Sequence, residues 1–425
     1  MIKIGVARKI ISPKVGCLLA GYPTESRASH IEDDLKLTAI VIESEKEKVV
    51  LISMDVISTC YKLFDFYKQE IKKLTGIENV IIFATHTHTG PRVLEEEGWG
   101  KIDWDFVDNV LTPRLLEAVK EANAKTEEVV VGIGCYDDCE VGVNRREIKN
   151  GKSHLGENPD GILNRKMYVV SFKNLKDKIL CNMIHYGAHG TSWIGNYFVS
   201  RDWMGIANDM LEEHSGAITF FANGAEGDIG HRKTDRKTGE KIMPKELGKR
   251  GGEDAIKAFN NIEEYKEVEL KIINDEIKLP YDELFPLELA KAKVEEMSNV
   301  NIYQEKKLEL AAWKEIIKAH GEEKKTHRTH KQIIIAIGDI ALVPTSYEIF
   351  CEIAMNLAEK SPFKYTLAIT NANGEDGYMP TEKAIALGGY ECWNFKHRSA
   401  YVLTDDVDTK FVEENLRILN KLKSL

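Results

Sequence analysis

Two histidines separated by one residue, His86 and His88, follow directly after a run of β-branched and apolar residues, Asn79–Phe83. That run predicts a buried strand, so the histidines stand where the strand ends. Residues two apart in an extended chain point to the same side, and imidazole binds transition metals and transfers protons near neutral pH. His86 and His88 are therefore predicted to face one pocket; the alternative is a pair of solvated loop histidines.

A second pair of histidines, His185 and His189, follows another predicted strand, Lys178–Ile184. Two residues four apart share a face when they lie on a helix. Gly187 and Gly190 disfavour a regular helix here because glycine has a low helix propensity. We therefore expect one histidine of this pair to be a metal ligand, and the residues alone leave open which one.

Two further loops carry residue types suited to chemistry. In the glycine-rich turn Asn223–His231, backbone N–H groups can approach a ligand closely and form an oxyanion hole; the alternative is an ordinary tight turn. Glu348 follows a predicted strand and is predicted to open a helix over 348–359, where a carboxylate is also a common cap. Two imidazoles and one carboxylate are a set that holds catalytic zinc and leaves a position for water.

The composition is that of a globular protein with an ample core. The chain has 425 residues, 43% of them hydrophobic, and a net charge of −10. The acidic excess argues against nucleic acid as a partner, and no apolar run approaches the roughly 18 residues of a membrane span. The first residues read as a strand rather than a signal peptide, and seven cysteines without a CxxC pair fit reduced thiols. We expect a cytoplasmic protein acting on a small molecule, with homo-oligomerisation left open.

The elements that must position these residues alternate along the chain. Strand patterns at 37–43 and 48–54 are followed by helical spacing over 59–74 and over 104–122. This order predicts an α/β (mixed α+β) fold, a β-sheet core flanked by helices, with the site at strand ends. The segment 284–325 is highly charged and largely helical, and we expect it to be an insertion within a single domain spanning 1–425.

In this order and spacing, the motifs resemble the neutral, non-lysosomal ceramidase family, zinc amidases that hydrolyse the N-acyl bond of ceramide. The two most specific motifs are His86-Thr87-His88 followed by Gly90-Pro91, and His189-Gly190-Thr191-Ser192. Supporting segments are 19–22, 31–35, 144–145, 223–224 with 227–228, and 389–391. The resemblance covers nearly the whole chain and implies the ceramidase-like catalytic domain, without the family's C-terminal immunoglobulin-like domain.

The resemblance also implies roles for individual residues. His86, His189 and Glu348 would be zinc ligands, with one Zn²⁺ per chain, which selects His189 over His185. His88 would face the substrate as a proton donor or oxyanion partner, and Arg145 would hold a polar substrate group or developing charge. The remaining members of the implied site are Asp228 and Tyr378 in the catalytic set and Gly21, Gly230 and Tyr390 in substrate binding.

Two positions depart from the family pattern. The family's serine falls on Gly230, so that hydroxyl is absent. The family's tyrosine ligand falls on Glu375, whose carboxylate is expected either to bind zinc or to bind a substrate hydroxyl or amine. A polar, carboxylate-rich pocket is not suited to a two-chain lipid.

These features lead to one main hypothesis and two rivals. The main hypothesis is a zinc-dependent hydrolase that cleaves an amide, or an ester, of a small polar or carbohydrate-like substrate, with Asp228, Glu375 or His88 moving protons. The first rival is a metal-dependent isomerase, epimerase or lyase of a sugar acid, since Glu375 suits proton abstraction beside a metal-bound carbonyl. The second rival is a binding protein that has lost catalysis.

Overall fold

A computed structural model describes residues 1–22, 26–300 and 302–425. Its strands are β1 (Ile2–Ile10), β2 (Lys36–Glu43), β3 (Lys48–Met54), β4 (Asn79–Ala84), β5 (Glu127–Tyr136), β6 (Gly142–Lys149), β7 (Lys152–Asn158), β8 (Met167–Asn174), β9 (Ile179–Tyr186), β10 (Ile218–Asn223), β11 (Ile229–His231), β12 (Leu270–Pro280), β13 (His327–Ile337), β14 (Ile340–Pro344), β15 (Glu348–Ile349), β16 (Tyr365–Ile369) and β17 (Tyr378–Met379). Its helices are α1 (Tyr61–Thr75), α2 (Trp104–Phe106), the π-helical η1 (Val107–Leu111), α3 (Thr112–Ala124), α4 (Asp202–Ser215), α5 (Pro244–Asn260), α6 (Leu287–Ser298), α7 (Gln304–Ala319), α8 (Cys351–Lys360), α9 (Glu382–Leu387), α10 (Tyr390–His397) and α11 (Val407–Ser424).

The largest sheet has eight strands in the order β10-β9-β8-β5-β1-β2-β3-β4. Its two edge pairs, β3 with β4 and β9 with β10, are parallel, and the pairs between them are antiparallel. The apolar, β-branched runs of these strands are buried on both faces, as expected for a sheet covered on both sides.

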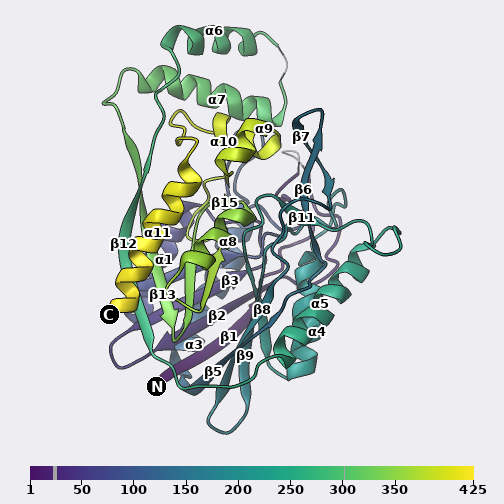
Figure 1. The fold of residues 1–425 in the computed structure, drawn as a ribbon, viewed down its shortest axis with the longest axis vertical. Helices are drawn as coiled ribbons and strands as arrows, with labels where there is room; N and C mark the ends of the chain where they lie inside the picture. The colour runs from purple at the N-terminus through teal and green to yellow at the C-terminus, as the bar shows by residue number, and fades with distance from the viewer. Residues whose placement is uncertain (23–25, 301) are drawn as a thin grey trace.

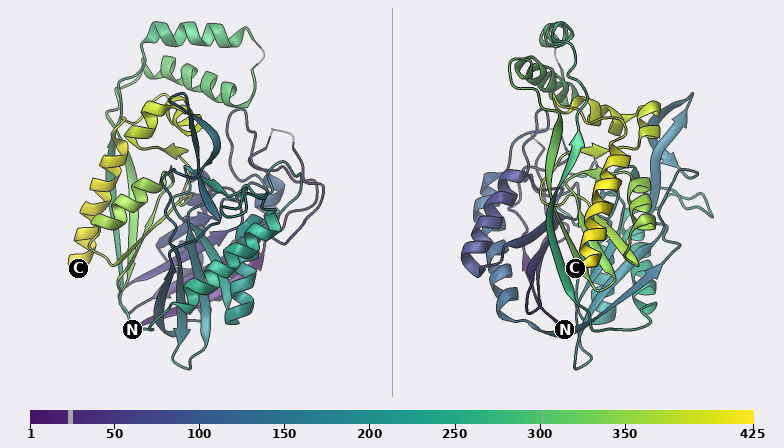
Figure 2. Two further views of the ribbon diagram at one scale, coloured as in Figure 1. Left: turned by 45° about the vertical axis from the view of Figure 1, so that its right-hand side comes forward. Right: turned by 60° about the vertical axis from the view of Figure 1, so that its left-hand side comes forward.

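A second sheet of four strands, β12-β13-β14-β16, packs on one face of the large sheet. One apolar cluster joins the two sheets and includes Ile40 of the large sheet and Ile335 of the small one. Helices α1, α3, α4 and α5 cover the outer face of the large sheet, and α8 and α11 cover the outer face of the small one. The right-hand view in Figure 2 shows purple and blue helices outside the large sheet and yellow α11 outside the small one. The expected fold class, sheets flanked by helices, is confirmed.

The segment after the small sheet's strand β16 also connects the two edge strands of the large sheet, β10 and β4, near their carboxyl ends. After β16, the Thr370 N–H donates to the Asn223 carbonyl at the end of β10 (3.0 Å), and the Asn373 N–H donates to the Ile82 carbonyl in β4 (2.8 Å). Strands β3 and β4 also contact β10. The loops that follow β4, β9 and β10 therefore meet at one place, although they are far apart in sequence.

A helical hairpin of α6 and α7 projects from one end of the molecule (Figure 1). It interrupts the connection between β12 and β13, which pair along their whole lengths from Leu270 with Ile337 to Pro280 with His327. The predicted insertion, 284–325, falls within that connection, and Asn301 inside it lies outside the described residues. The assignment of the whole chain to one domain stays a prediction.

One local prediction was wrong. Glu348 does not open a helix: it lies in β15, which pairs in parallel with β17, and α8 begins only at Cys351. A strand forms here instead of a helix because the Glu348 N–H donates to the Gly377 carbonyl (2.9 Å), a partner far away in sequence. No helix in the described part of the chain is both long enough and apolar enough to cross a membrane.

Candidate active site

The first histidine of the site, His86, lies immediately beyond β4. Its backbone has a positive φ of 66°, so the chain has left the extended conformation and strand alternation does not place it beside His88. The ring Nδ1 lies 2.7 Å from the Ile57 carbonyl. A carbonyl oxygen only accepts, so Nδ1 carries the proton and Nε2 presents a lone pair.

The second histidine, His189, is fully buried beyond β9. Its Nδ1 lies 2.9 Å from the Glu226 carbonyl and 3.1 Å from the Ile229 carbonyl, so Nε2 again presents a lone pair. Gly190 lets the two histidine loops touch, because an added Cβ there would lie 2.5 Å from the His86 carbonyl oxygen. The loops also pair directly, since the His88 N–H donates to the Gly190 carbonyl (2.9 Å).

Glu348 brings a carboxylate to the same place. Its Oε2 lies 3.1 Å from Nε2 of His189 and 3.6 Å from Nε2 of His86. Both Oε2 of Glu348 and Nε2 of His189 are buried without a hydrogen-bond partner among the described residues. Two acceptor atoms at such a distance repel each other unless a cation lies between them.

The charge states fit a cation at this point. Burial lowers the pKa of His86 and of His88, and lowers the pKa of His189 to about 3. Burial acts to raise the pKa of Glu348, but the positive charges around it, Arg145 among them, hold that pKa below its usual value. Neutral imidazoles and an ionised carboxylate are the forms that coordinate a metal.

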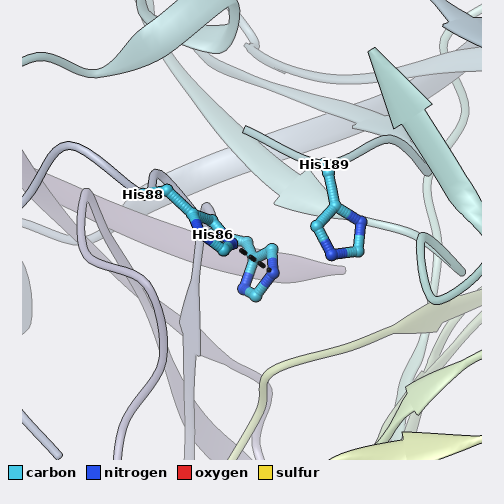
Figure 3. Close-up of side chains that lie close together, drawn as sticks. All are labelled: His86, His88 and His189. Carbon is cyan, nitrogen blue, oxygen red and sulfur yellow. Dashed lines mark hydrogen bonds between the residues drawn. The ribbon is translucent and has the colours of Figure 1, made fainter. Parts of the chain in front are cut away.

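The grouping of ligand-type side chains agrees with this. Within the described residues, two overlapping groups bring their ligand atoms within 4.8 Å of one another. One contains His86, His88 and His189, and the other contains His86, Glu226 and Glu348. Figure 3 shows the three imidazoles converging, with the His86 and His88 rings linked through their Nε2 atoms at 3.2 Å. The residues present therefore fit a divalent metal with nitrogen and oxygen ligands.

These groups border a cavity of about 90 Å³. Its lining includes His86 and Glu348 from the metal-ligand set, together with aromatic and charged side chains from the loops after β4 and from the last quarter of the chain. The lining residues are Ala20, Gly21, Ile57, Ser58, His86, His88, Arg92, Leu94, Glu96, Trp99, Gly100, Glu348, Glu375, Tyr378, Tyr390, Asn394 and Arg398.

His88 lines this cavity, and Gly21 leaves room for its imidazole ring. The His88 Nδ1 is buried without a hydrogen-bond partner in the described structure. Gly21 has a φ of +73°, and an added Cβ would lie 2.5 Å from that Nδ1. Glycine at this position therefore leaves the space that the imidazole occupies.

The Gly21→Ala variant is expected to displace His88 and lower kcat by about tenfold or more, the contribution of a misplaced proton carrier, while bound metal is unchanged. Gly16→Ala is the matched control, since Gly16 also has a positive φ of 91° but an added Cβ there meets nothing within 4 Å. Kinetics and metal analysis of both variants test this expectation. Equal losses in the two variants would show that backbone strain, and not contact with His88, is responsible.

Arg145 reaches the site through Tyr378. On β6, its Nη2 donates to the Tyr378 hydroxyl (3.0 Å) and to the Gly227 carbonyl (2.9 Å), and its Nε donates to Glu391 (2.8 Å). The Tyr378 ring stacks on His189 with centroids 6.5 Å apart. Tyr390 packs edge-on against Tyr378 and also lines the cavity.

Glu375 lines the cavity, but its carboxylate is engaged elsewhere. One oxygen accepts from the Gly377 N–H (2.8 Å), and the other is ion-paired with Arg398. Arg398 also pairs with Glu96 at 2.7 Å. Among the described residues, the ligand groups around His86 do not include Glu375. This placement argues against Glu375 as a metal ligand and favours the substrate-binding alternative.

Three other residues lie outside the lining of the cavity as the structure describes it. Asp228 is buried, where it accepts from the Cys351 N–H (2.7 Å) and from Asn144 (3.0 Å), and burial raises its pKa to about 7. This placement argues against direct proton transfer by Asp228.

An added Cβ at Gly230 would lie 3.3 Å from Cβ of Arg145. His185 bonds the Ala368 carbonyl at 2.7 Å and is absent from both ligand groups.

Sequence reasoning missed four residues of this site: Glu96, Glu226, Glu391 and Arg398. Glu226 is fully buried, accepts from Asn371 (2.6 Å) and Thr370, and has a pKa raised chiefly by burial. The signal for Glu226 was its place in the glycine-rich turn. Glu96 and Arg398 carried no signal, because each lies among other charged residues in a loop or at a helix end.

Fold and site together define a layered α/β protein with a buried centre of two histidines and one glutamate. No protein-family model and no curated protein matches the chain. Among solved structures, it is similar to the neutral ceramidase from Pseudomonas aeruginosa, with 17% sequence identity, a TM-score of 0.73, and coverage of 99% of this chain and 75% of that one. It is also similar to a ceramidase complexed with C2, with 16% identity, a TM-score of 0.72, and coverage of 99% and 76%. The chain therefore has the fold of the neutral ceramidases, as the motifs predicted.

Proposed function

We propose that this chain is a zinc-dependent hydrolase that cleaves the amide bond, or an ester bond, of a small polar substrate. The observation that carries the proposal is the convergence of Nε2 of His86, Nε2 of His189 and Oε2 of Glu348, the last two only 3.1 Å apart. Three protein ligands with one open position are typical of catalytic zinc. The shared fold supports the same reading.

In the proposed reaction, a water oxygen bonds to the carbonyl carbon, the C–N bond breaks, and a proton from the water passes to the leaving nitrogen. When bound, Zn²⁺ would polarise the carbonyl and lower the pKa of the attacking water. His88 would carry the proton, since it lines the cavity and its buried Nδ1 has no hydrogen-bond partner among the described residues. Arg145 would position the Tyr378 hydroxyl for a hydrogen bond to the substrate oxygen.

The cavity favours a small substrate over a two-chain lipid. An apolar cavity of about 150 Å³ accommodates benzene, so one of about 90 Å³ encloses only a short fragment around the reacting bond. Its lining includes two glutamates and two arginines besides the metal ligands. A cytoplasmic location is part of the proposal, since all seven cysteines are free and five of them are buried.

Removal of the metal is expected to abolish turnover. The purified chain should contain about one zinc ion per molecule, lose hydrolysis after chelation and regain it when Zn²⁺ is returned. Mass spectrometry of the products should show two fragments whose summed mass exceeds that of the substrate by one water. A single product of unchanged mass would instead indicate an isomerase or epimerase, and absence of stoichiometric metal would contradict the proposal.

A further inference from the structure

A second group of charged side chains lines the cavity beside the metal-ligand set. The Arg398 guanidinium lies between two glutamates, with Nη1 2.7 Å from Oε1 of Glu96 and Nη2 paired with Oε2 of Glu375. The three residues come from separate parts of the chain. Their side chains are only 22%, 15% and 12% exposed, in the order Arg398, Glu96 and Glu375. All three line the cavity and are largely shielded from bulk solvent.

The surrounding backbone is built to hold this group. The Gly377 N–H donates to the second oxygen of Glu375 (2.8 Å). Gly377 has a φ of +74°, and an added Cβ would lie 3.0 Å from Cδ of Arg398. Glycine thus lets the arginine stem pass close to the loop that carries Glu375. Arg398 follows α10, and the adjacent Ala400 N–H donates to Glu315 of α7 (2.9 Å), so the helical hairpin supports this side of the cavity.

A polar atom next to the group lacks a partner. Oδ1 of Asn394, on α10, is buried without a hydrogen bond among the described residues and belongs to a side chain that lines the cavity. A buried polar atom is normally satisfied by protein, water or ligand. Trp99 and Tyr390 add aromatic side chains to the same lining. Such a combination of a few polar groups with aromatic walls is typical of a small-molecule site.

The chemistry of the group selects one class of ligand. Arg398 offers N–H donors, whereas the two carboxylates and Oδ1 of Asn394 offer acceptors. A hydroxyl group both donates and accepts, so it matches this mixture, whereas an ammonium group only donates and a carboxylate only accepts.

We propose that Glu96, Glu375 and Arg398 form a substrate clamp that binds vicinal hydroxyl groups of a neutral polyhydroxylated substrate. The clamp would fix the hydroxyl-bearing part of the substrate next to the reacting bond and thereby determine specificity. The statement that this substrate also carries an amide bond rests on the proposed function. The binding of hydroxyl groups is independent of the proposed function, and it can be measured without turnover.

The test is calorimetric titration of the full chain with compounds that carry no amide or ester bond. Glycerol and erythritol are the neutral polyols, ethylamine is the cationic control and acetate is the anionic control. At least one polyol is expected to bind saturably, about tenfold or more tighter than either control. Glu96→Gln and Glu375→Gln are each expected to weaken that polyol by about tenfold or more, because a hydrogen bond to a charged group is lost. Glu97→Gln, at an exposed neighbour, should leave it unchanged.

Several outcomes would overturn the clamp. These are no saturable binding of either polyol, tighter binding of ethylamine or acetate, or unchanged polyol affinity in both glutamine variants. Circular dichroism shows whether the variants fold. If the variants do not fold, the relative affinities of the unmodified chain for the polyols and the two controls test the clamp. Polyol binding without any amide or ester turnover would refute the hydrolase and leave the clamp standing. Amide hydrolysis with an unaltered kcat/KM in both glutamine variants would refute the clamp alone.

Discussion

The His86→Ala variant is expected to lose its zinc and at least about 10³-fold of kcat/KM for an amide substrate. Its Nε2 is one of three ligand atoms that meet at a buried point, and its Nδ1 bond to the Ile57 carbonyl directs that lone pair. A catalytic metal supplies several kcal/mol of transition-state stabilisation, and about 4 kcal/mol corresponds to about 10³-fold in rate. Plasma mass spectrometry for zinc and steady-state kinetics on the same preparation provide the two measurements.

The chain contains its own control for this experiment. His185 lies near the end of β9 and His189 just beyond it, but His185 bonds the Ala368 carbonyl (2.7 Å), whereas His189 presents Nε2 to Glu348 (3.1 Å). His189→Ala should lose zinc as His86→Ala does, and His185→Ala should keep it. Retention of both zinc and turnover by His86→Ala would show that the metal ligands have been assigned wrongly.

The Glu391→Ala variant is expected to destabilise the fold by about 3–5 kcal/mol, the range for breaking a buried ion pair by removing one partner. The Glu391 carboxylate is 1% exposed and accepts from Arg145 and from Arg146, each at 2.8 Å. Its loss leaves two buried guanidinium groups without their carboxylate. Activity should also fall, because Arg145 holds the Tyr378 hydroxyl at the cavity. Urea unfolding followed by circular dichroism measures the free energy of unfolding.

A surface ion pair provides the comparison. Glu413 pairs with Lys410 at 3.2 Å, and both side chains are about half exposed. Glu413→Ala should cost less than about 1 kcal/mol, since solvent screens such a pair. Similar losses in the two glutamate variants would mean that burial does not strengthen the Glu391 contacts. Glu391→Gln, which keeps the shape and one acceptor, should recover part of the stability.

Much of the secondary structure followed from local pattern. The predicted strand before His86 corresponds to β4, and the predicted helix over 59–74 corresponds to α1. Hydrophobic patterns with a period of 2 or 3.6 residues depend on neighbouring residues, so they can be recognised without knowledge of the fold. Glu348 was misplaced in a helix because its strand exists only through pairing with Tyr378, thirty positions further along the chain.

Part of the site also followed from residue types at strand ends. His86, His189 and Glu348 were named from the motifs and their resemblance, and the structure brings their ligand atoms together. Asp228 and Glu375 were named on the same grounds, but the structure gives their carboxylates other partners. Motifs identify which residues carry ligand atoms, whereas the partner of each atom depends on contacts over long sequence distances.

The amino-acid sequence by itself determined the class of fold, the loops that end the strands and the imidazoles and carboxylates placed in them, because these depend on local periodicity and side-chain chemistry. Only the tertiary structure decided which of those groups share a cavity. The two edges of the eight-stranded sheet meet through the segment after β16, and this closure brings the loops after β4, β9 and β10 together. It also placed Arg398 between Glu96 and Glu375, since an ion pair among three distant segments exists only once the chain has folded.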